Sequence, residues 1–287
     1  MTDSDFQPFA GASALIFGGG QNIGRAIALE WARRGAKVAI ADLNAEGAAV
    51  TAEEIRAAGG EAIGTGADVT SDDSVAAAVA AAEAAFGPLD ILMNNAGILS
   101  GGNPQDIPVS AWQQMLDVNL LGQVRAINLV LPGMLERGRG HIANTASFAG
   151  MYPFACSRVH YAASKAAVLS YSENLALYCL PYGVRVSCLC PGPVMTTSVH
   201  GMKHFSESYE MRMPGDHLTL KSQEETAIVL SDGMRDGRIV IPTDELVWPT
   251  MRELAAGPDA FIAKKAAEFA AGNSGRPMVP AQFLKPA

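Results

Sequence analysis

The sequence predicts an α/β fold in which a doubly wound parallel sheet lies between two layers of helices. Three observations support this. Short runs rich in β-branched residues alternate with Ala-rich segments of helical spacing. Two of the runs, KVAIA and LDILM, are almost entirely apolar, as strands buried on both faces are. The first run enters a helix through a glycine-rich turn at residues 18–24.

The elements follow one another with short connections as far as residue 190. The expected strands are residues 12–17, 37–41, 61–65, 89–93, 141–145 and 184–190. The expected helices are residues 23–34, 46–58, 71–86, 110–136 and 160–179. Because neighbouring parallel strands need a crossover connection, this alternation predicts three layers, α/β/α.

The pattern changes after Pro191. Residues 195–219 are irregular and carry scattered Met, His, Phe and Tyr, which is typical of a lid beyond the end of a strand. The remaining expected elements are a helix at 222–234, a strand at 238–241 and a helical region at 246–271. The tail from Gly272 is expected to be loose or to pack on a neighbouring subunit. We therefore expect one domain over residues 1–287, with a C-terminal helical extension over about 246–287.

Composition excludes several classes of protein. The 287 residues are 49% hydrophobic, which supports a large core and excludes a disordered chain. The net charge of −8 disfavours binding to duplex nucleic acid. The sequence contains no run of about 18 apolar residues, so no membrane helix is expected. The acidic N-terminus lacks the features of a secretion signal. The four cysteines and five histidines show no metal-binding spacing, so we expect no metal and a reducing, cytoplasmic location.

The glycine-rich turn reads GGGQNIG. Glycine allows the backbone to approach a pyrophosphate closely, and a helix N-terminus offers free N–H groups and a positive dipole end. Asn22 stands where the spacing Gly-x-x-x-Gly-x-Gly has its middle glycine, and Asn tolerates left-handed geometry. The alternative is an ordinary tight turn. The expected dinucleotide contacts here are Gly18, Gln21, Asn22, Ile23 and Gly24.

Asp42 ends the second strand, 18 residues after Gly24. An acid at about this distance binds the adenosine ribose, and its charge repels a 2′-phosphate. Leu43 follows, so no arginine stands there to bind such a phosphate. The pair Asp42 and Leu43 therefore favours NAD over NADP. The alternative is that Asp42 only caps the next turn.

Three further segments identify a family resemblance. They are Asn-Asn-Ala-Gly at 94–97, Tyr-Ala-Ala-Ser-Lys at 161–165 and Pro-Gly-Pro-Val at 191–194. Together with the first turn they make the chain, over residues 10–197, resemble the short-chain dehydrogenases/reductases, which have a Rossmann-like fold. The usual ending of that family is absent after Thr197.

The resemblance implies roles for individual residues. Asp68 and Val69 would contact adenine, and Asn119 would hold a water. Ser147 would bind the substrate oxygen. Residues 191–194 would meet the nicotinamide carboxamide. The further cofactor contacts it implies are Asn95, Ala96, Gly97, Tyr161, Lys165, Pro191, Gly192, Val194 and Thr196.

The chemistry itself explains the spacing of Tyr161 and Lys165. A free tyrosine has a pKa of about 10, and a neighbouring ammonium favours the phenolate. Positions i and i+4 share one helix face. Tyr161 would take the hydroxyl proton as hydride leaves for NAD, Lys165 would also hold the nicotinamide ribose, and Ser147 would position the substrate oxygen. Asn119 would anchor a water that links Lys165 to solvent.

Each of these roles has a plainer alternative. Tyr161 and Lys165 would be a surface pair, Ser147 a polar strand-end residue, and Asn119 a structural residue that bends its helix.

The expected substrate is a hydrophobic secondary alcohol or its ketone, including cyclic, aromatic and steroid-like compounds. The supporting side chains near the site are Met151, Tyr152, Phe154, Met195, Met202, Phe205, Tyr209, Met211 and Met213. The alternative is that they pack the lid onto the body or onto another subunit. The long Ala-rich helices of the family imply a homotetramer or dimer.

Two other functions compete. One is a redox sensor that binds the dinucleotide without turnover, against which Ser147, Tyr161 and Lys165 argue. The other is a sugar-nucleotide epimerase or dehydratase, which resembles longer relatives with a C-terminal substrate domain for which this tail is expected to be too short.

Overall fold

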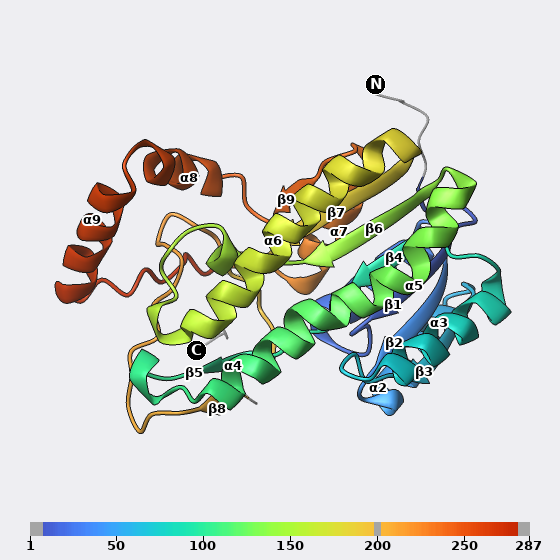
Figure 1. Ribbon diagram of the computed structural model, residues 1–287, viewed down its shortest axis with the longest axis horizontal. Coiled ribbons are helices and arrows are strands. Elements are labelled where there is room, and N and C mark those ends of the chain that lie inside the picture. The colour runs from blue at the N-terminus through green and yellow to red at the C-terminus, as the bar shows by residue number, and fades with distance from the viewer. Residues whose placement is uncertain (1–7, 198–201, 281–287) are drawn as a thin grey trace.

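A single parallel sheet forms the centre of the molecule. The computed structural model describes residues 8–197 and 202–280. The strands lie in the order β3-β2-β1-β4-β6-β7-β9, and each pairs in parallel with its neighbours. Their bounds are β1 Ser13–Phe17, β2 Lys37–Asp42, β3 Ala62–Gly66, β4 Ile91–Asn94, β6 Gly140–Thr145, β7 Val184–Cys190 and β9 Val240–Pro242. This confirms the predicted doubly wound sheet (Figure 1).

Helices cover both faces of the sheet. On one face lie α1 (Asn22–Arg33), α2 (Ala45–Ala57) and α7 (Gln223–Arg235). On the other face lie α3 (Asp72–Phe86), α5 (Gly122–Arg137) and α6 (Val159–Cys179).

Alternate strand residues reach the two helical layers. Ile16 and Ile40 belong to the core on the α1 side, whereas Leu15 and Ala39 belong to the core on the α5 side. Successive strand side chains point to opposite faces, so both sets need apolar residues. This is why the strands are apolar almost throughout.

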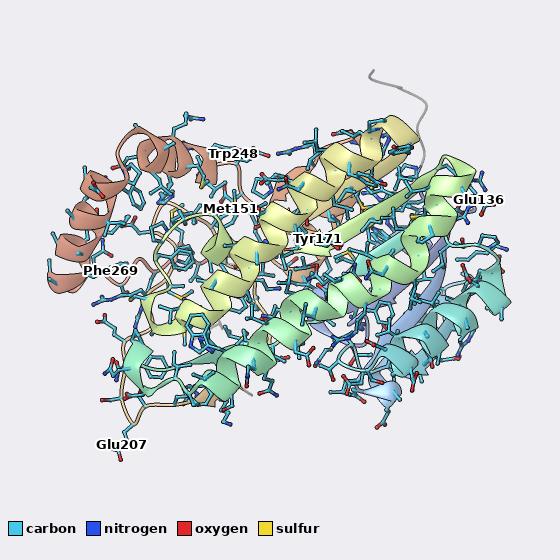
Figure 2. All side chains as sticks on the ribbon, in the orientation of Figure 1. Glu136, Met151, Tyr171, Glu207, Trp248 and Phe269 are labelled. Carbon is cyan, nitrogen blue, oxygen red and sulfur yellow. The ribbon has the colours of Figure 1, made fainter. Side chains whose placement is uncertain are left out.

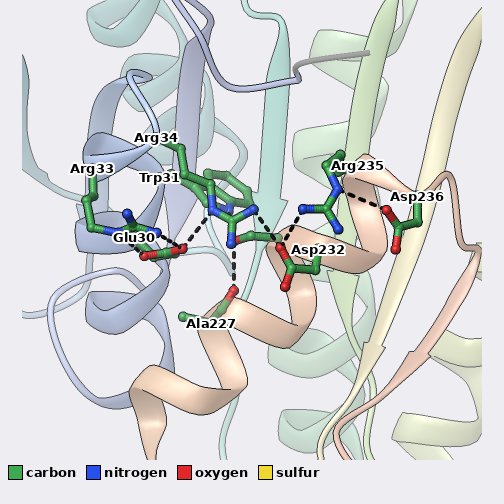
Figure 3. Close-up of polar contacts among 9 residues, drawn as sticks. Glu30, Trp31, Arg33, Arg34, Ala227, Asp232, Arg235 and Asp236 are labelled. Carbon is green, nitrogen blue, oxygen red and sulfur yellow. Dashed lines mark hydrogen bonds and ion pairs between the residues drawn. The ribbon is translucent and has the colours of Figure 1, made fainter. Parts of the chain in front are cut away.

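Helices α1 and α7 are joined by buried and half-buried polar contacts (Figure 3). Trp31 donates from Nε1 to Ser231 Oγ over 3.2 Å. Arg34 pairs with Glu30 on its own helix at 2.7 Å and with Asp232 on α7 at 2.9 Å. These contacts fix the late helix α7, and with it the β9 edge, to the first helix of the chain.

The helix expected at 110–136 is interrupted. It consists of α4 (Val109–Leu116) and α5, joined by a π-helical turn at Asp117–Leu121. Within Val109–Arg137 an 18-residue window reaches a mean hydropathy of 1.2, so by length and composition this stretch could cross a membrane, and 39% of that window is buried inside the protein. Ala126, Ile127 and Met134 are buried against the sheet.

A short strand pair and the last helices of the chain lie beyond the carboxyl ends of the sheet strands (Figure 1). β5 (Ser100–Gly101) pairs in parallel with β8 (Lys203–His204). The helical region expected at 246–271 forms two helices, α8 (Val247–Ala256) and α9 (Pro258–Ala270), because Pro258 lacks the N–H that a continuous helix needs. Short 3₁₀ turns occupy Pro104–Asp106, Phe148–Gly150, Cys156–Arg158 and Leu180–Tyr182. Of the expected lid and extension, residues 198–201 and 281–287 lie outside the described residues.

We call residues 202–221 the lid segment. Its end pairs on one side with the loop after β7, where Lys221 N donates to Pro193 O over 2.9 Å. On the other side it pairs with the C-terminal tail. Met278 N donates to Leu218 O over 2.8 Å, and Leu220 N donates to Met278 O over 2.9 Å. The tail that was expected to be loose or to pack on a neighbour therefore packs on the lid segment of its own chain.

Candidate active site

The glycine-rich turn links β1 to α1, and close contacts require its glycines. A Cβ on Gly24 would lie 1.8 Å from the carbonyl oxygen of Gly18. A Cβ on Gly18, whose φ is +77°, would lie 2.6 Å from Ala96. Helix α1 begins after Gln21 with no side-chain cap and no acidic residue in its first turn. The start of α1, which includes Ile23, thus suits an anion such as a pyrophosphate.

Asn22 has the left-handed backbone that the sequence predicted, with φ 49°. Its Oδ1 accepts hydrogen bonds from the N–H and the hydroxyl of Thr197, both at 3.0 Å. A glycine here would supply the backbone but not this bond. Asn22 therefore ties the glycine-rich turn to the loop after β7, which also holds Val194 and Thr196.

Asp42 lies beside the same turn and is 8% exposed. Its Oδ2 accepts from Gly20 N and its Oδ1 from Asn44 N, both at 2.9 Å. The bond from Asn44 N caps the next turn, which was the alternative role considered for Asp42. The carboxylate makes this bond while it also lies beside the glycine-rich turn. Leu43 is 78% exposed and brings no cation to the place.

The next part of the site comes from the strands beside β1. Asn95, after β4, donates from Nδ2 to Gly18 O over 2.9 Å and accepts from the Thr145 hydroxyl over 3.2 Å. Asp68, after β3, accepts from the N–H and hydroxyl of Thr70 at 2.9 and 2.7 Å, which lowers the pKa of its carboxyl. Val69 packs on Gly122 at the start of α5. Together these residues form the wall next to the glycine-rich turn.

Tyr161 lies in the first turn of α6, facing Ser147 at the end of β6. Burial raises the pKa of the Tyr161 phenol, while a hydrogen bond with Ser147 and the positive charge of Arg158 lower it. The Lys165 Nζ lies 5.8 Å from the centre of the Tyr161 ring. The structure thus brings Ser147, Tyr161 and Lys165 together, as the sequence predicted.

Lys165 is 3% exposed, and burial lowers the pKa of its ammonium to about 8. Its Nζ donates to the backbone carbonyl of Thr145 over 2.8 Å. A Cβ on Gly97 would lie 3.5 Å from this Nζ and 3.2 Å from Asn119 Oδ1. Gly97 therefore leaves the approach to the ammonium open.

Asn119 occupies the middle of the π-helical turn and is fully buried. Its Oδ1 accepts from Ile98 N at 2.8 Å, and its Nδ2 donates to Ile98 O and to Ser164 Oγ, both at 3.1 Å. The Asn119 carbonyl accepts from Gln123 Nε2 at 2.9 Å. Asn119 therefore joins the loop after β4 to α6 through its side chain, which is the structural role that was the alternative reading.

The loop after β7 closes the site beside Ser147. Pro191 O accepts from Phe148 N at 2.9 Å and from the Ser147 hydroxyl at 3.5 Å. Gly192 N donates to Thr243 Oγ1 over 2.9 Å, and a Cβ there would lie 2.6 Å from the Phe148 ring. The loop thus carries its backbone close to Ser147.

Several side chains expected to face the substrate are used in packing. Met151, Tyr152 and Met202 are 6%, 3% and 5% exposed. The Tyr152 hydroxyl donates to Pro214 O over 2.8 Å. Trp248 on α8 and Phe269 on α9 pack on the cluster that contains Met151 and Tyr152 (Figure 2).

The sequence analysis missed two residues of this region. Thr145 connects Lys165 to Asn95. The sequence feature that could have revealed it is a polar Asn-Thr pair at the end of an apolar strand. Arg158 is buried three residues before Tyr161, and a basic residue so close to the expected phenol was the signal for it.

These features fit a nicotinamide dinucleotide. The glycine contacts form a backbone cradle that a Cβ would fill, Asp42 lies beside it, and Ser147, Tyr161 and Lys165 lie at the other end of the same sheet edge. In doubly wound folds the ligand binds at the carboxyl ends of the strands where the strand order reverses, which here is between β1 and β4. Fold and site together define an oxidoreductase that transfers hydride with NAD(P).

Comparisons with known proteins agree. A family profile described as short chain dehydrogenase matches residues 12–206. The chain is 42% identical over 187 residues, 65% of this chain and 74% of the relative, to 2,5-dichloro-2,5-cyclohexadiene-1,4-diol dehydrogenase LinX of Sphingobium indicum. It is 40% identical over 184 residues, 64% of this chain and 72% of the relative, to 2-(S)-hydroxypropyl-CoM dehydrogenase 3 of Xanthobacter autotrophicus.

Solved structures show the same relationship. A short-chain dehydrogenase/reductase from Burkholderia phymatum, crystallised in complex with NAD, superimposes with a TM-score of 0.75 at 31% identity, covering 85% of this chain and 93% of that one. The chain belongs to the short-chain dehydrogenase family.

Proposed function

We propose that the protein interconverts a secondary alcohol and its ketone with NAD(H). The observation that carries this is the grouping of the Ser147 hydroxyl, the Tyr161 phenol and the Lys165 ammonium at the sheet edge that also holds the glycine-rich turn. The comparisons support hydride transfer by members of the family, and the grouped site residues support the proposed transfer of the proton.

In the proposed reaction Tyr161 is the general base for oxidation and the general acid for reduction. Ser147 donates a hydrogen bond to the substrate oxygen, and the same bond positions that oxygen against the phenol. Lys165 holds positive charge beside the phenolate and contacts the nicotinamide ribose. The bound nicotinamide supplies the acceptor for the hydride that leaves the carbinol carbon.

NAD is the proposed cofactor, rather than NADP. The support is the carboxylate of Asp42, held beside Gly20 by a 2.9 Å bond with no cation at position 43. A negative charge here repels a 2′-phosphate and accepts from ribose hydroxyls. The proposed contacts to NAD are the cofactor-binding residues expected from the sequence, of which Gly18 is the first along the chain and Thr196 the last.

The proposed substrate has an apolar body. Phe205, Tyr209 and Met213 are half-buried in the lid segment, so they keep some surface available beside the site. The relative from Sphingobium is named for a cyclic diol, which supports the inclusion of cyclic alcohols.

We further propose a cytoplasmic enzyme that forms a dimer or tetramer and works as one unit over residues 1–287. The support is exposed apolar side chains on the long helices, where Leu129 on α5 and Leu177 and Tyr178 on α6 are 47%, 75% and 56% exposed and would be covered by a neighbouring subunit. Light scattering of the purified protein tests the oligomer.

The test of the activity is a panel of secondary alcohols with NAD, followed by NADH absorbance. The Tyr161→Phe variant should lose about a hundred- to ten-thousandfold in rate while NAD still binds. Unchanged turnover in that variant would refute the role of the phenol. NAD binding without turnover across the whole panel would favour the sensor reading instead.

A further inference from the structure

A buried arginine stands next to the proposed catalytic tyrosine. Arg158 directly precedes α6 and is 8% exposed, although a guanidinium stays protonated under any ordinary condition. Burial lowers its pKa, but from a starting value so high that the charge remains. Arg158 therefore places a permanent positive charge inside the protein, one helical turn from the reacting phenol.

This charge has no carboxylate partner among residues 8–197 and 202–280. Arg34, by comparison, pairs with two acids, whereas the groups that act electrostatically on Arg158 are two phenols and a thiol. Burying a cation without a counter-ion is costly. Proteins accept that cost where the counter-ion arrives with a ligand.

The hydrogen bonds of Arg158 are also incomplete. Its Nη2 donates to the backbone carbonyl of Arg212 in the lid segment over 2.6 Å, and its Nε is buried with no partner. Its Cζ lies 5.9 Å from the centre of the Phe154 ring. A guanidinium offers five N–H donors, so one bond to a carbonyl leaves most of them available.

The surroundings favour an anion. Helix α6 begins with no side-chain cap and no acidic residue in its first turn, so its positive end adds to the charge of Arg158. Arg158 precedes Tyr161 by three residues, and its guanidinium reaches the lid segment through the bond to Arg212 O.

We propose that Arg158 binds a carboxylate carried by the substrate, so that the substrate is a hydroxy acid or oxo acid with an apolar chain between its two polar ends. The assignment rests on the proposed dehydrogenase function and names the substrate class of that same site. A planar carboxylate matches the paired N–H groups of a guanidinium. The carboxylate itself is unchanged by the reaction, since only the carbinol carbon loses hydride and its hydroxyl loses a proton to Tyr161.

The competing explanation is that Arg158 only fastens the lid segment through Arg212 O. Arg212 provides the matched control. Its side chain pairs with Glu210 and donates to Phe269 O at 3.0 Å and Asn273 O at 3.2 Å, so Arg212→Gln weakens the lid segment but leaves the backbone carbonyl that Arg158 contacts.

The kinetic test uses methyl carbinols with one to four methylenes before a terminal carboxylate, each beside its neutral carboxamide and a plain alcohol of equal length. With NAD, the best carboxylate should exceed its amide in kcat/KM by about ten- to a hundredfold, mostly through KM. Arg158→Gln should remove this preference, Arg158→Lys should restore part of it, and Arg212→Gln should keep it. Equal use of carboxylate and amide by the unaltered protein, or loss of the preference in Arg212→Gln, overturns the assignment while leaving the dehydrogenase function standing.

A binding test separates the two proposals if no alcohol in the panel is oxidised. Valerate and valeramide are titrated calorimetrically into the full chain with NAD present. Valerate should bind the unaltered protein at least about tenfold more tightly than Arg158→Gln, and valeramide should not distinguish them. Valerate binding that is absent, or equal in both proteins, overturns the carboxylate site whatever the activity result.

Discussion

The Nζ of Lys165 donates a 2.8 Å hydrogen bond to the backbone carbonyl of Thr145, the last residue of β6. The hydroxyl of Thr145 in turn donates to Asn95, which donates to Gly18 in the glycine-rich turn. One residue thus connects the proposed proton-transfer group to the proposed pyrophosphate site. Because the anchor is a backbone atom at the end of a buried strand, it holds the ammonium in place beside the Tyr161 ring.

Removal of the Lys165 charge should move the pH profile of alcohol oxidation. Oxidation needs the Tyr161 phenolate, so its rate rises with pH, and an ammonium 5.8 Å from the ring favours that form. We expect Lys165→Met to reach half-maximal rate at higher pH and to be at least about tenfold slower near neutrality. Lys165→Arg keeps a charge and should shift the profile less. Superimposable profiles for the Met variant and the unaltered enzyme would contradict this.

The cofactor preference should depend on the charge of Asp42. Asp42→Asn keeps one of the two acceptor oxygens, so it retains the bond to either Gly20 N or Asn44 N, and it removes the repulsion of a 2′-phosphate. We expect the NADP/NAD ratio of kcat/KM to rise by about ten- to a hundredfold. Asp42→Ala should raise the ratio similarly and also lower thermal stability, because it loses both bonds. An unaltered protein that already prefers NADP would refute the role of Asp42.

Gly24→Ala should damage the cofactor end specifically. The new methyl group would lie 1.8 Å from Gly18 O, so the turn must open. We expect a loss of at least about 1–3 kcal/mol in unfolding free energy and weakened NAD binding, measured by denaturation and by calorimetry. Gly257→Ala is the control, since its Cβ would have no neighbour closer than 3.8 Å. Equal NAD affinity in both variants would argue against the turn as the cofactor cradle.

The bond between Asn22 and Thr197 should affect binding more than folding. Asn22→Gly keeps the left-handed backbone but removes both 3.0 Å bonds to Thr197. We expect about a five- to hundredfold rise in KM for NAD, from a net value of about 0.5–1.5 kcal/mol for each of the two hydrogen bonds, with a nearly unchanged melting temperature. Asn22→Ala should also lose stability, because a methyl group disfavours this backbone. A KM for NAD in Asn22→Gly equal to that of the unaltered protein would show that the bond serves only the fold.

Acid should destabilise the protein through His141. This histidine lies in β6 with its Nε2 2.9 Å from Ser187 Oγ, and burial, with a smaller effect of the Arg185 charge, lowers its pKa to about 3. The folded protein keeps His141 neutral, whereas the unfolded chain binds the proton below a pKa of about 6.5. Stability therefore falls as pH drops from about 6.5 to about 3, by up to about 1.4 kcal/mol per pH unit. Denaturation curves of His141→Gln should lack this part of the slope.

Much of the fold followed from local patterns. The strand at Val184–Cys190 matches its prediction residue for residue, and the other strands of the sheet differ by a few residues at their ends. Apolar runs reveal buried strands because burial on both faces leaves no polar position. The π-helical turn at Asp117–Leu121 could not be predicted in this way. It depends on the bonds of Asn119 to Ile98 and Ser164, which are distant in sequence.

The candidate site was also partly predictable. Ser147, Tyr161 and Lys165 were recognised because their chemistry requires particular residue types at particular spacings. The partners of Arg158 and the bond between Asn22 and Thr197 were not, since each joins segments whose approach is set by the packing of the lid segment. Composition predicted that the lid segment is apolar, but it did not predict which of its side chains are buried.

The pairing of residues 274–278 with the lid segment also has a consequence for the order of assembly during synthesis. Met213 N donates to Ser274 O over 2.8 Å and Gly215 N to Gly275 O over 2.9 Å, so these bonds need residues made some sixty positions later. All seven strands precede residue 243 and are complete when the ribosome still holds that stretch. A nascent chain would thus complete the sheet before its lid segment is fastened, and a chain cut short near residue 270 would keep the sheet and lose the bonds that hold the lid segment.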